Sequence, residues 1–366
     1  MEKTVLTSDG LKNALKNFTV EESVIEYIWN GFDANADTIF INEVKNSMNG
    51  TDYIEISDNG SGIARPGLDI KFKPIFQSEK LSSNFFKNDV NIKGKKGIGR
   101  LSFYNTAYSA KWLTTYNDGA INKKYSISVS GADLTSFVPS DEIETTTPTG
   151  TTVYLYFSQN INFDNVVTAI AIEYAWYLNV YKSKKIIING KQLDFSFLLV
   201  NRDSKKGDIN DIQYEIEICV WTQKLNEEYS KYYYLDDNSE VKFKENTTLN
   251  NKGDSFYHSV LIKSNLFDDF VFESSNYETN LLGAKNKNCA SYKALKAVAD
   301  ELLNSIRKKF IRKYTSKFII DLKKAGHYPK YDKNNVVDVF KEEQLDDMVS
   351  NIYYFEPKIF SSLSNI

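Results

Sequence analysis

Apolar and polar positions alternate with two different periods in the first half of the chain. Helical spacing runs from Val20 to Asn35, where Val24, Ile28 and Phe32 fall on one side, and it returns at residues 166–180. Shorter apolar or alternating runs predict strands at residues 38–41, 53–56, 110–116, 125–129, 151–157 and 185–188. The pattern therefore predicts a domain that mixes helices and strands, over residues 1–200.

The second half changes its pattern after a polar stretch. Residues 201–211 are charged and almost free of apolar side chains, so we interpret them as a linker. Strands at 212–221, 231–235 and 257–263 and a long helix at 291–324 then predict a smaller α+β domain over 212–326. Residues 327–366 alternate acidic and aromatic clusters, and we interpret them as a tail that begins a further region.

Composition narrows the class of protein. The 366 residues are 42% hydrophobic and 25% charged, which predicts a soluble globular chain of about two domains. The formal charge of -3 argues against attraction of the whole molecule to a polyanion. Cys219 and Cys289 have no partner motif, which argues against a disulfide framework or a zinc site and favours a reducing, cytoplasmic setting. The sequence has no apolar run long enough to cross a membrane, so we expect no membrane partner.

One helix face carries only oxygen-bearing polar side chains. These residues are Glu22, Glu26, Asn30, Asp33 and Asp37. They follow one another at intervals of four, four, three and four residues, which places them opposite the apolar stripe. A solvated face is the plain alternative, although such faces usually contain Lys or Arg. An all-oxygen face suits Mg²⁺, for which one Asn carbonyl can serve as the protein ligand. A carboxylate one turn earlier could take a proton from an attacking water.

Two glycine-containing turns follow. The first, Asp58-Asn59-Gly60-Ser61-Gly62, comes at the end of an apolar strand. It is either a simple turn or a binding turn, in which the Asp58 carboxylate accepts a hydrogen bond from an exocyclic amine. Gly94-Lys-Lys-Gly97-Ile98-Gly99 precedes a short helical pattern, so its amides could bind phosphate oxygens, although a generic glycine loop is an equal alternative. It fits neither the P-loop nor the dinucleotide fingerprint. The aperiodic residues 65–96 between the turns are either a lid or a disordered segment.

In this order, the three motifs resemble the nucleotide-binding fold of DNA gyrase, the ninety-kilodalton heat-shock chaperone, sensor histidine kinases and MutL, the GHKL superfamily. The matching boxes are Glu26 to Ala34, Asp58 to Gly62 and Gly94 to Gly99, and Thr149-Gly150-Thr151 is similar to the family's Gly-Thr element. The resemblance covers residues 20–195 and implies a Bergerat-type α/β sandwich, with a mainly antiparallel mixed sheet and helices on one face, followed by a transducer-like α+β domain.

The resemblance also implies ATP and Mg²⁺ as cofactors and a role for each motif residue. Asn30 would bind Mg²⁺, Glu26 would orient or deprotonate the hydrolytic water, Asp58 would read the adenine amine, and Thr151 would support that contact. Residues 65–96 would form the lid. The remaining expected contacts to nucleotide or phosphates are Asp33, Gly60, Gly62, Ile63, Ser78, Lys80, Lys96, Gly97, Ile98, Gly99 and Arg100, and the expected transducer lysines for the γ-phosphate are Lys285 and Lys287.

These roles favour a Mg²⁺-dependent ATPase that forms a homodimer on ATP binding and acts as a clamp or switch. A histidine kinase is disfavoured because neither His258 nor His327 lies ahead of the first box. A nucleotide-gated, chaperone-like interaction module is the alternative. The basic region 293–324 is a candidate DNA contact, and an effector protein or C-terminal region is another candidate partner. The chain resembles prokaryotic gyrase-chaperone-type ATPases related to the MORC group, and this resemblance implies a role in DNA maintenance or in defence against phage.

Overall fold

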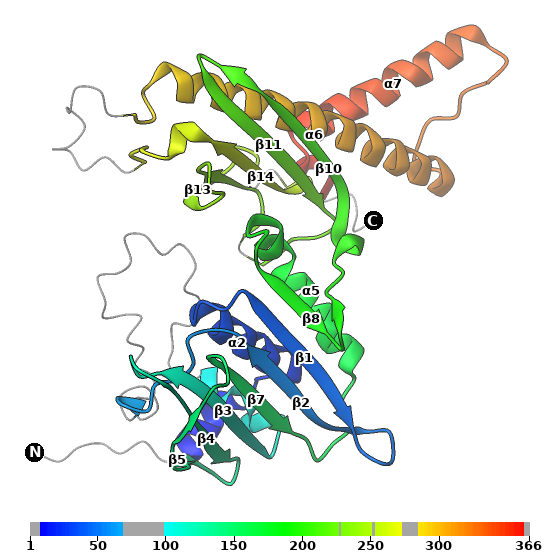
Figure 1. Cartoon of the computed structure of the whole chain (residues 1–366). Coiled ribbons are helices and arrows are strands. Elements are labelled where there is room, and N and C mark those ends of the chain that lie inside the picture. The colour runs from blue at the N-terminus through cyan, green and yellow to red at the C-terminus, as the bar shows by residue number, and fades with distance from the viewer. Residues whose placement is uncertain (1–7, 69–98, 227, 251–252, 273–284, 362–366) are drawn as a thin grey trace, which may run out of the picture. The chain divides into compact units, whose positions relative to one another are not determined.

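A computed structural model describes residues 8–68, 99–226, 228–250, 253–272 and 285–361 (Figure 1). The chain divides into two compact units, Met1–Phe195 and Ser196–Ile366, and each is described by itself. No helix in these described ranges is both long enough and apolar enough to cross a membrane.

The first unit is built on one mixed sheet of nine strands. The order along the sheet is β5-β4-β3-β7-β2-β1-β8-β9, with β6 paired to β4, and of these pairs β1 with β8 alone is parallel. The strands are β1 Thr38–Lys45, β2 Thr51–Asp58, β3 Ser109–Asn117, β4 Asn122–Ser130, β5 Asp133–Pro139, β6 Ile143–Thr145, β7 Gly150–Tyr156, β8 Lys185–Ile188 and β9 Lys191–Gln192.

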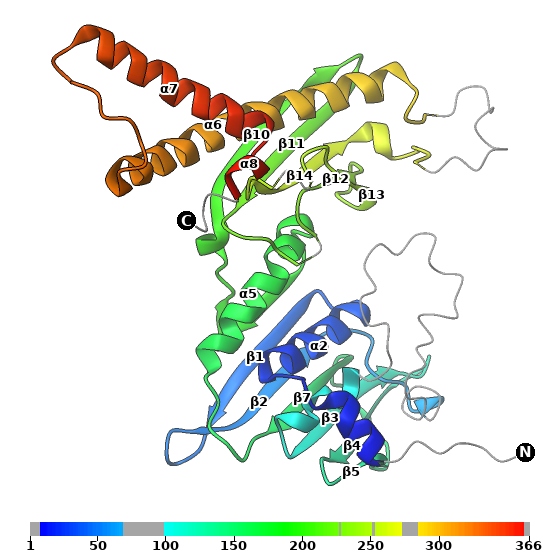
Figure 2. The ribbon, with the colours of Figure 1, turned by 180° about the vertical axis from the view of Figure 1, so that it is seen from behind.

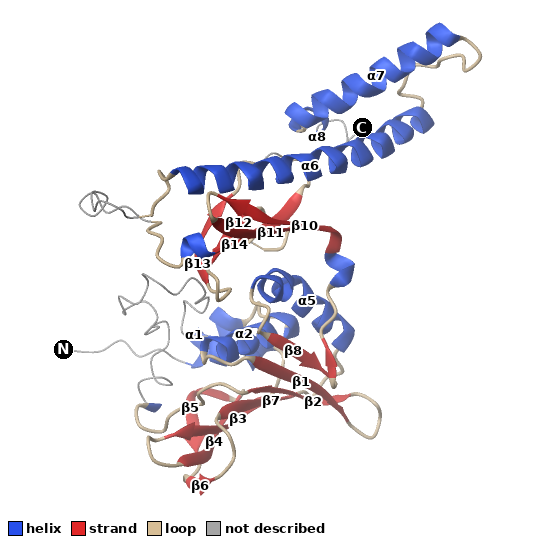
Figure 3. Cartoon of the chain, turned by 45° about the horizontal axis from the view of Figure 1, so that its top comes forward, coloured by secondary structure: helices blue, strands red, loops and turns tan. Residues whose placement is uncertain are grey.

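Helices cover one face of this sheet (Figures 2 and 3). They are α1 Ser8–Leu15, α2 Val20–Asp33 and α5 Phe163–Val180, with the 3-10 helix η2 Gly99–Asn105. Alternate residues of the sheet, such as Ile39 and Ile41, are buried against these helices, whereas Phe40 between them is exposed. The predicted α+β sandwich with helices on one face is therefore confirmed.

Helix α2 follows the predicted pattern closely. It begins with a capping box, in which the Thr19 hydroxyl accepts from the Glu22 N–H and the Glu22 carboxylate accepts from the Thr19 N–H. Val24, Ile28 and Phe32 are buried as predicted. The helix ends two residues before the predicted Asn35, because Asn35 has a left-handed φ of 62°.

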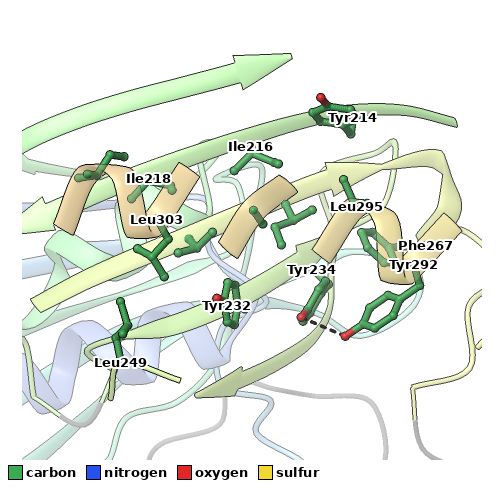
Figure 4. Packing of buried hydrophobic residues seen from close by; sticks show 14 of the residues in the cluster. Tyr214, Ile216, Ile218, Tyr232, Tyr234, Leu249, Phe267, Tyr292, Leu295 and Leu303 are labelled. Atoms are coloured by element: carbon green, nitrogen blue, oxygen red, sulfur yellow. Dashed lines mark hydrogen bonds between the residues drawn. The ribbon is translucent and has the colours of Figure 1, made fainter. Parts of the chain in front are cut away.

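The second unit packs the long helix α6 across a five-stranded sheet of order β10-β11-β14-β12-β13 (Figure 4). Leu295 and Leu303 of α6 bury against strand residues such as Ile216, Ile218 and Tyr232. The elements are β10 Leu199–Ile209, β11 Ile212–Trp221, β12 Lys231–Leu235, β13 Val241–Asn246, β14 Tyr257–Ser264, α6 Ala290–Ala325, α7 Val336–Phe355, α8 Lys358–Ser361 and the 3-10 turns η3 Ser196–Leu198 and η4 Asn265–Phe267.

The prediction of a linker at 201–211 is wrong. Those residues form most of β10, which pairs antiparallel with β11 through a turn where Asn210 and Asp211 have φ of 51° and 64°. Because β10 is an edge strand with few buried side chains, it lacks the apolar alternation by which a strand is recognised.

The predicted tail contains helices α7 and α8 within its described residues, 327–361. Helix α7 runs antiparallel to the second half of α6, where Lys323 Nζ lies 2.6 Å from Glu342 Oε1 and the Thr315 and Ser350 hydroxyls are 2.9 Å apart. Nearer the start of α6, Arg307 donates to the Tyr354 carbonyl at 2.9 Å. The basic helix and the acidic tail therefore pair with each other in part.

Candidate functional site

Asp58 lies at the end of β2, with one carboxylate oxygen fixed by the backbone. Its Oδ1 accepts from the Gly60 N–H at 2.8 Å and from the Thr151 N–H at 3.2 Å. Burial raises the pKa of Asp58, while these two N–H groups oppose the rise by stabilising the charged form. Oδ2 makes no hydrogen bond with another described residue, so it is available to a ligand.

Glycines let three backbone segments converge on this carboxylate. A Cβ on Gly31 of α2 would lie 2.6 Å from Ile39 Cδ1 and 3.0 Å from the Asp58 Cβ, and a Cβ on Gly60 would lie 2.6 Å from the Ala34 carbonyl oxygen. Gly62, with φ of +73°, would place a Cβ 2.0 Å from the Thr115 carbonyl oxygen. The loop after β2 therefore lies against both the end of α2 and strand β3.

Thr114 of β3 is a buried residue that sequence reasoning missed. Its hydroxyl accepts from the Ile63 N–H at 2.8 Å and lies 3.0 Å from the Thr151 hydroxyl and 3.3 Å from the Gly150 carbonyl oxygen. One side chain thus joins the loop after Asp58 to the start of β7. A Thr in an alternating strand carries no sign of this role, because the two partners come from distant parts of the sequence.

The polar stripe of α2 divides into structural and candidate functional residues. Glu22 belongs to the capping box, and Asp37 lies beyond the helix and pairs with Lys184 at 3.0 Å. Glu26, Asn30 and Asp33 remain on a half-buried face. The Asn30 side chain makes no hydrogen bond within the described ranges, which leaves its carbonyl oxygen for a ligand.

No group of three or more His, Cys, Asp or Glu side chains within the described ranges is arranged to hold a metal ion. A site with one Asn ligand completed by phosphate oxygens and water does not require such a group.

Two further residues that the sequence did not single out fix η2 against α2. The Ser23 hydroxyl donates to the Ser102 carbonyl at 2.8 Å, and the Tyr27 hydroxyl donates to the Arg100 carbonyl at 2.7 Å. Burial raises the pKa of Tyr27, so it remains a neutral donor. These bonds bring Gly99 against Glu26, where a Cβ on Gly99 would lie 1.9 Å from Glu26 Oε1. Burial lowers the pKa of the neighbouring Arg100.

Several predicted residues lie outside the described ranges. The predicted lid, 65–96, is described only as far as Leu68, so Ser78, Lys80 and Lys96 fall outside. The same holds for Gly97 and Ile98 of the glycine loop. Of that loop, Gly99 and Arg100 are described and lie beside α2, as stated above.

Lys285 and Lys287 lie in the second unit, just before α6. The Lys287 ammonium pairs with Glu245 at 2.9 Å and lies 4.4 Å from the centre of the Phe243 ring. Lys285 is exposed, and its carbonyl oxygen accepts from the Val271 N–H at 3.0 Å. Their role as transducer lysines stays a prediction, and Lys287 would have to leave Glu245 to fulfil it.

Helix α2 and strands β2 and β7 converge on the half-buried Asp58 carboxylate, which forms one candidate binding site. Residues 18–151 match the family model described as Histidine kinase-, DNA gyrase B-, and HSP90-like ATPase. The first unit therefore contains a domain of the GHKL superfamily, and at the level of that family the match supports ATP binding and hydrolysis.

Among solved structures, the crystal structure of the ATPase region of Saccharomyces cerevisiae topoisomerase II is similar, with a TM-score of 0.41 and 14% identity over 67% of this chain and 72% of that chain. At this level the likeness supports no conclusion about function. No curated protein matches the chain.

Proposed function

We propose that the first unit binds ATP with Mg²⁺ and hydrolyses it. The observation that carries this proposal is Asp58, a half-buried carboxylate with Oδ1 fixed by the Gly60 and Thr151 N–H groups and Oδ2 directed to no described partner. Such a carboxylate can accept one hydrogen bond from an exocyclic amine in a fixed direction. The family match of residues 18–151 supports adenine as the ring that carries this amine.

The glycines and two threonines hold the loop after Asp58 in position. Without side chains at Gly60 and Gly62 this loop packs against α2 and β3, and the paired Thr114 and Thr151 hydroxyls fix the strands on its other side. Asp33 and Ile63 complete the proposed walls of the nucleotide site. The phosphates would lie toward Gly99 and Arg100, near the start of η2.

The face of α2 supplies the proposed chemistry. The Asn30 carbonyl oxygen is a hard ligand of the type that Mg²⁺ prefers, and the ion would neutralise charge on the phosphates. Glu26 lies one turn earlier, beside Gly99, where its carboxylate can orient a water and accept its proton. A water activated by Glu26 is the proposed acceptor of the phosphoryl group.

Glu26→Gln tests the hydrolytic role. We expect nucleotide affinity to persist while turnover falls by about 100-fold or more, because the base is lost and the shape is kept. Glu22→Gln is the matched control, with the same chemical change one turn earlier on the helix, and it should retain turnover. Equal turnover in the two variants would overturn the role of Glu26.

Asp58→Asn tests the binding site itself. Because an amide nitrogen would face the adenine amine as a second donor, we expect ATP affinity to fall by at least about tenfold. The competing proposal is a nucleotide-gated interaction module without useful hydrolysis. It predicts that partner binding depends on Asp58 but is indifferent to Glu26→Gln.

We further propose that ATP binding closes the lid and favours a dimer that acts on DNA. The observation in favour of DNA is a set of α6 residues that are exposed and form no ion pair with another described residue, namely Lys293, Lys308, Lys309, Arg312, Lys313, Lys317 and Lys324. The remaining basic residues of the region, by contrast, are paired with acidic ones, as Lys296 is with Asp300.

Titration of fluorescent duplex DNA at several salt concentrations tests this contact. Lys309→Glu with Lys313→Glu should weaken binding and flatten its salt dependence, whereas Lys191→Glu with Lys205→Glu, at exposed positions on β9 and β10, serves as a control of equal charge change. Unchanged affinity in the α6 variant would leave an effector protein as the favoured partner. A MORC-like role in DNA maintenance or phage defence, and a cytoplasmic location, stay predictions.

A further inference from the structure

Helix α7 carries apolar side chains on two opposite faces. One face, with the buried Tyr353, packs on α6 through Tyr314 and the contacts of Ser350 and Glu342. The other face is exposed within its unit, with Met348 at 55% and Phe355 at 73% relative exposure. A helix with two apolar faces is usually covered on both sides, so the outer face of α7 lacks a partner among the described elements.

The outer face has the spacing of a coiled-coil seam. Lys341, Leu345, Met348, Ile352 and Phe355 follow one another at intervals of four, three, four and three residues. We call these five residues the α7 seam. They line a groove of about 950 Å³ with Phe340, Gln344 and others. The seam spans 15 residues, or about 21 Å from end to end, which matches a straight helical partner.

We propose that the occupant of this groove is α7 of a second copy of the chain, paired antiparallel about a twofold axis at Met348. In that register Leu345 faces Asn351 and Ile352 of the second helix, and Lys341 reaches its Phe355 and Glu356. Lys341 is the only basic residue of α7, and the exposed Glu356 directly follows the helix. Lys341 and Glu356 therefore give the two ends of the paired seam opposite charges.

The charges select this arrangement over the alternatives. A parallel pair would place the two Lys341 ammonium groups side by side inside the seam, which is unfavourable. Glu343, Asp347 and Glu356 are exposed near the seam, and their negative charge opposes docking on an anionic membrane surface or on nucleic acid. The contact lies wholly within the second unit and involves no residue of the proposed ATP site, so it forms without nucleotide and is a separate contact from the ATP-dependent pairing proposed above.

Molecular mass in solution is the first test, with the full chain at micromolar concentration and no nucleotide. We expect twice the chain mass of 42.0 kDa. Ile352→Asp should raise the dissociation constant by at least about tenfold, because two carboxylates would enter the apolar seam. Val336→Asp is the matched control, since Val336 is exposed on the same helix but off the seam, and it should leave the mass unchanged.

The orientation is tested by charge reversal and by crosslinking. Lys341→Glu should weaken the dimer, and Lys341→Glu with Glu356→Lys should restore it. In a Cys289→Ser background, Met348→Cys should form a symmetric disulfide under oxidation, whereas Lys341→Cys should not, because only residue 348 meets its own copy. A monomeric wild type, equal crosslinking at both positions, or a dimer insensitive to Ile352→Asp would each overturn the proposal. Failure of the ATPase tests would leave it standing.

Discussion

Replacing Thr114 by Val is the sharpest test of how the nucleotide site is held. Thr114 is fully buried, and Val has nearly the same shape, so the change removes a hydroxyl without opening a cavity. The hydroxyl accepts from the Ile63 N–H at 2.8 Å and bonds toward β7 at 3.0 and 3.3 Å. The variant leaves the Ile63 N–H without its acceptor.

The magnitude follows from these contacts. A buried donor that loses its partner costs about 1–3 kcal/mol of unfolding free energy. In a unit of this size, that corresponds to a fall in melting temperature of about 2–12 °C. ATP affinity should fall as well, because the loop from Asp58 to Ile63 loses its attachment to β3 and Thr151 loses a hydroxyl neighbour.

Thr115→Val is the control, since Thr115 is the adjacent residue, is also buried, and makes no side-chain hydrogen bond with another described residue. Chemical unfolding gives the stability of both variants, and ATP titration gives their affinity. If Thr114→Val and Thr115→Val agree within about 0.5 kcal/mol, Thr114 does not organise the site.

Other predictions concern single contacts. Gly99→Ala should lower turnover by about 100-fold, because the new Cβ displaces the Glu26 carboxylate by about 1 Å or more, and steady-state kinetics measures this. Burial lowers the pKa of His258 to about 4 from an ordinary 6.5, so the unfolded chain binds the extra proton between these values. Stability should therefore fall by on the order of 3 kcal/mol as pH drops from about 6.5 to 4, and His258→Gln should flatten that dependence in unfolding curves. Arg307→Met should cost about 3–5 kcal/mol, because the Asp254 carboxylate, 2.7 Å away, stays buried without its cation, and adding Asp254→Asn should recover part of the loss.

Local patterns predicted the elements whose signal lies within a few residues. Helix α2 shows its buried stripe and capping box in consecutive residues, and β11 and β12 were predicted with the bounds that the structure shows. Strand β10 was missed because an exposed edge strand has no apolar alternation. Helix α7 was missed because apolar side chains on two faces hide the helical period.

The sequence by itself determined the motif residues and their order, since Asp58, Gly60 and Gly62 are adjacent in the chain and Glu26 and Asn30 are one turn apart. Tertiary structure decided which of these residues meet and what holds them. Thr114 bonds to Ile63 and Thr151, which lie 51 and 37 residues away in the chain. Tyr27 of α2 bonds to Arg100 of η2, 73 residues away. Such contacts leave no periodic trace in the sequence, because each depends on where the sheet brings two distant strands or helices together.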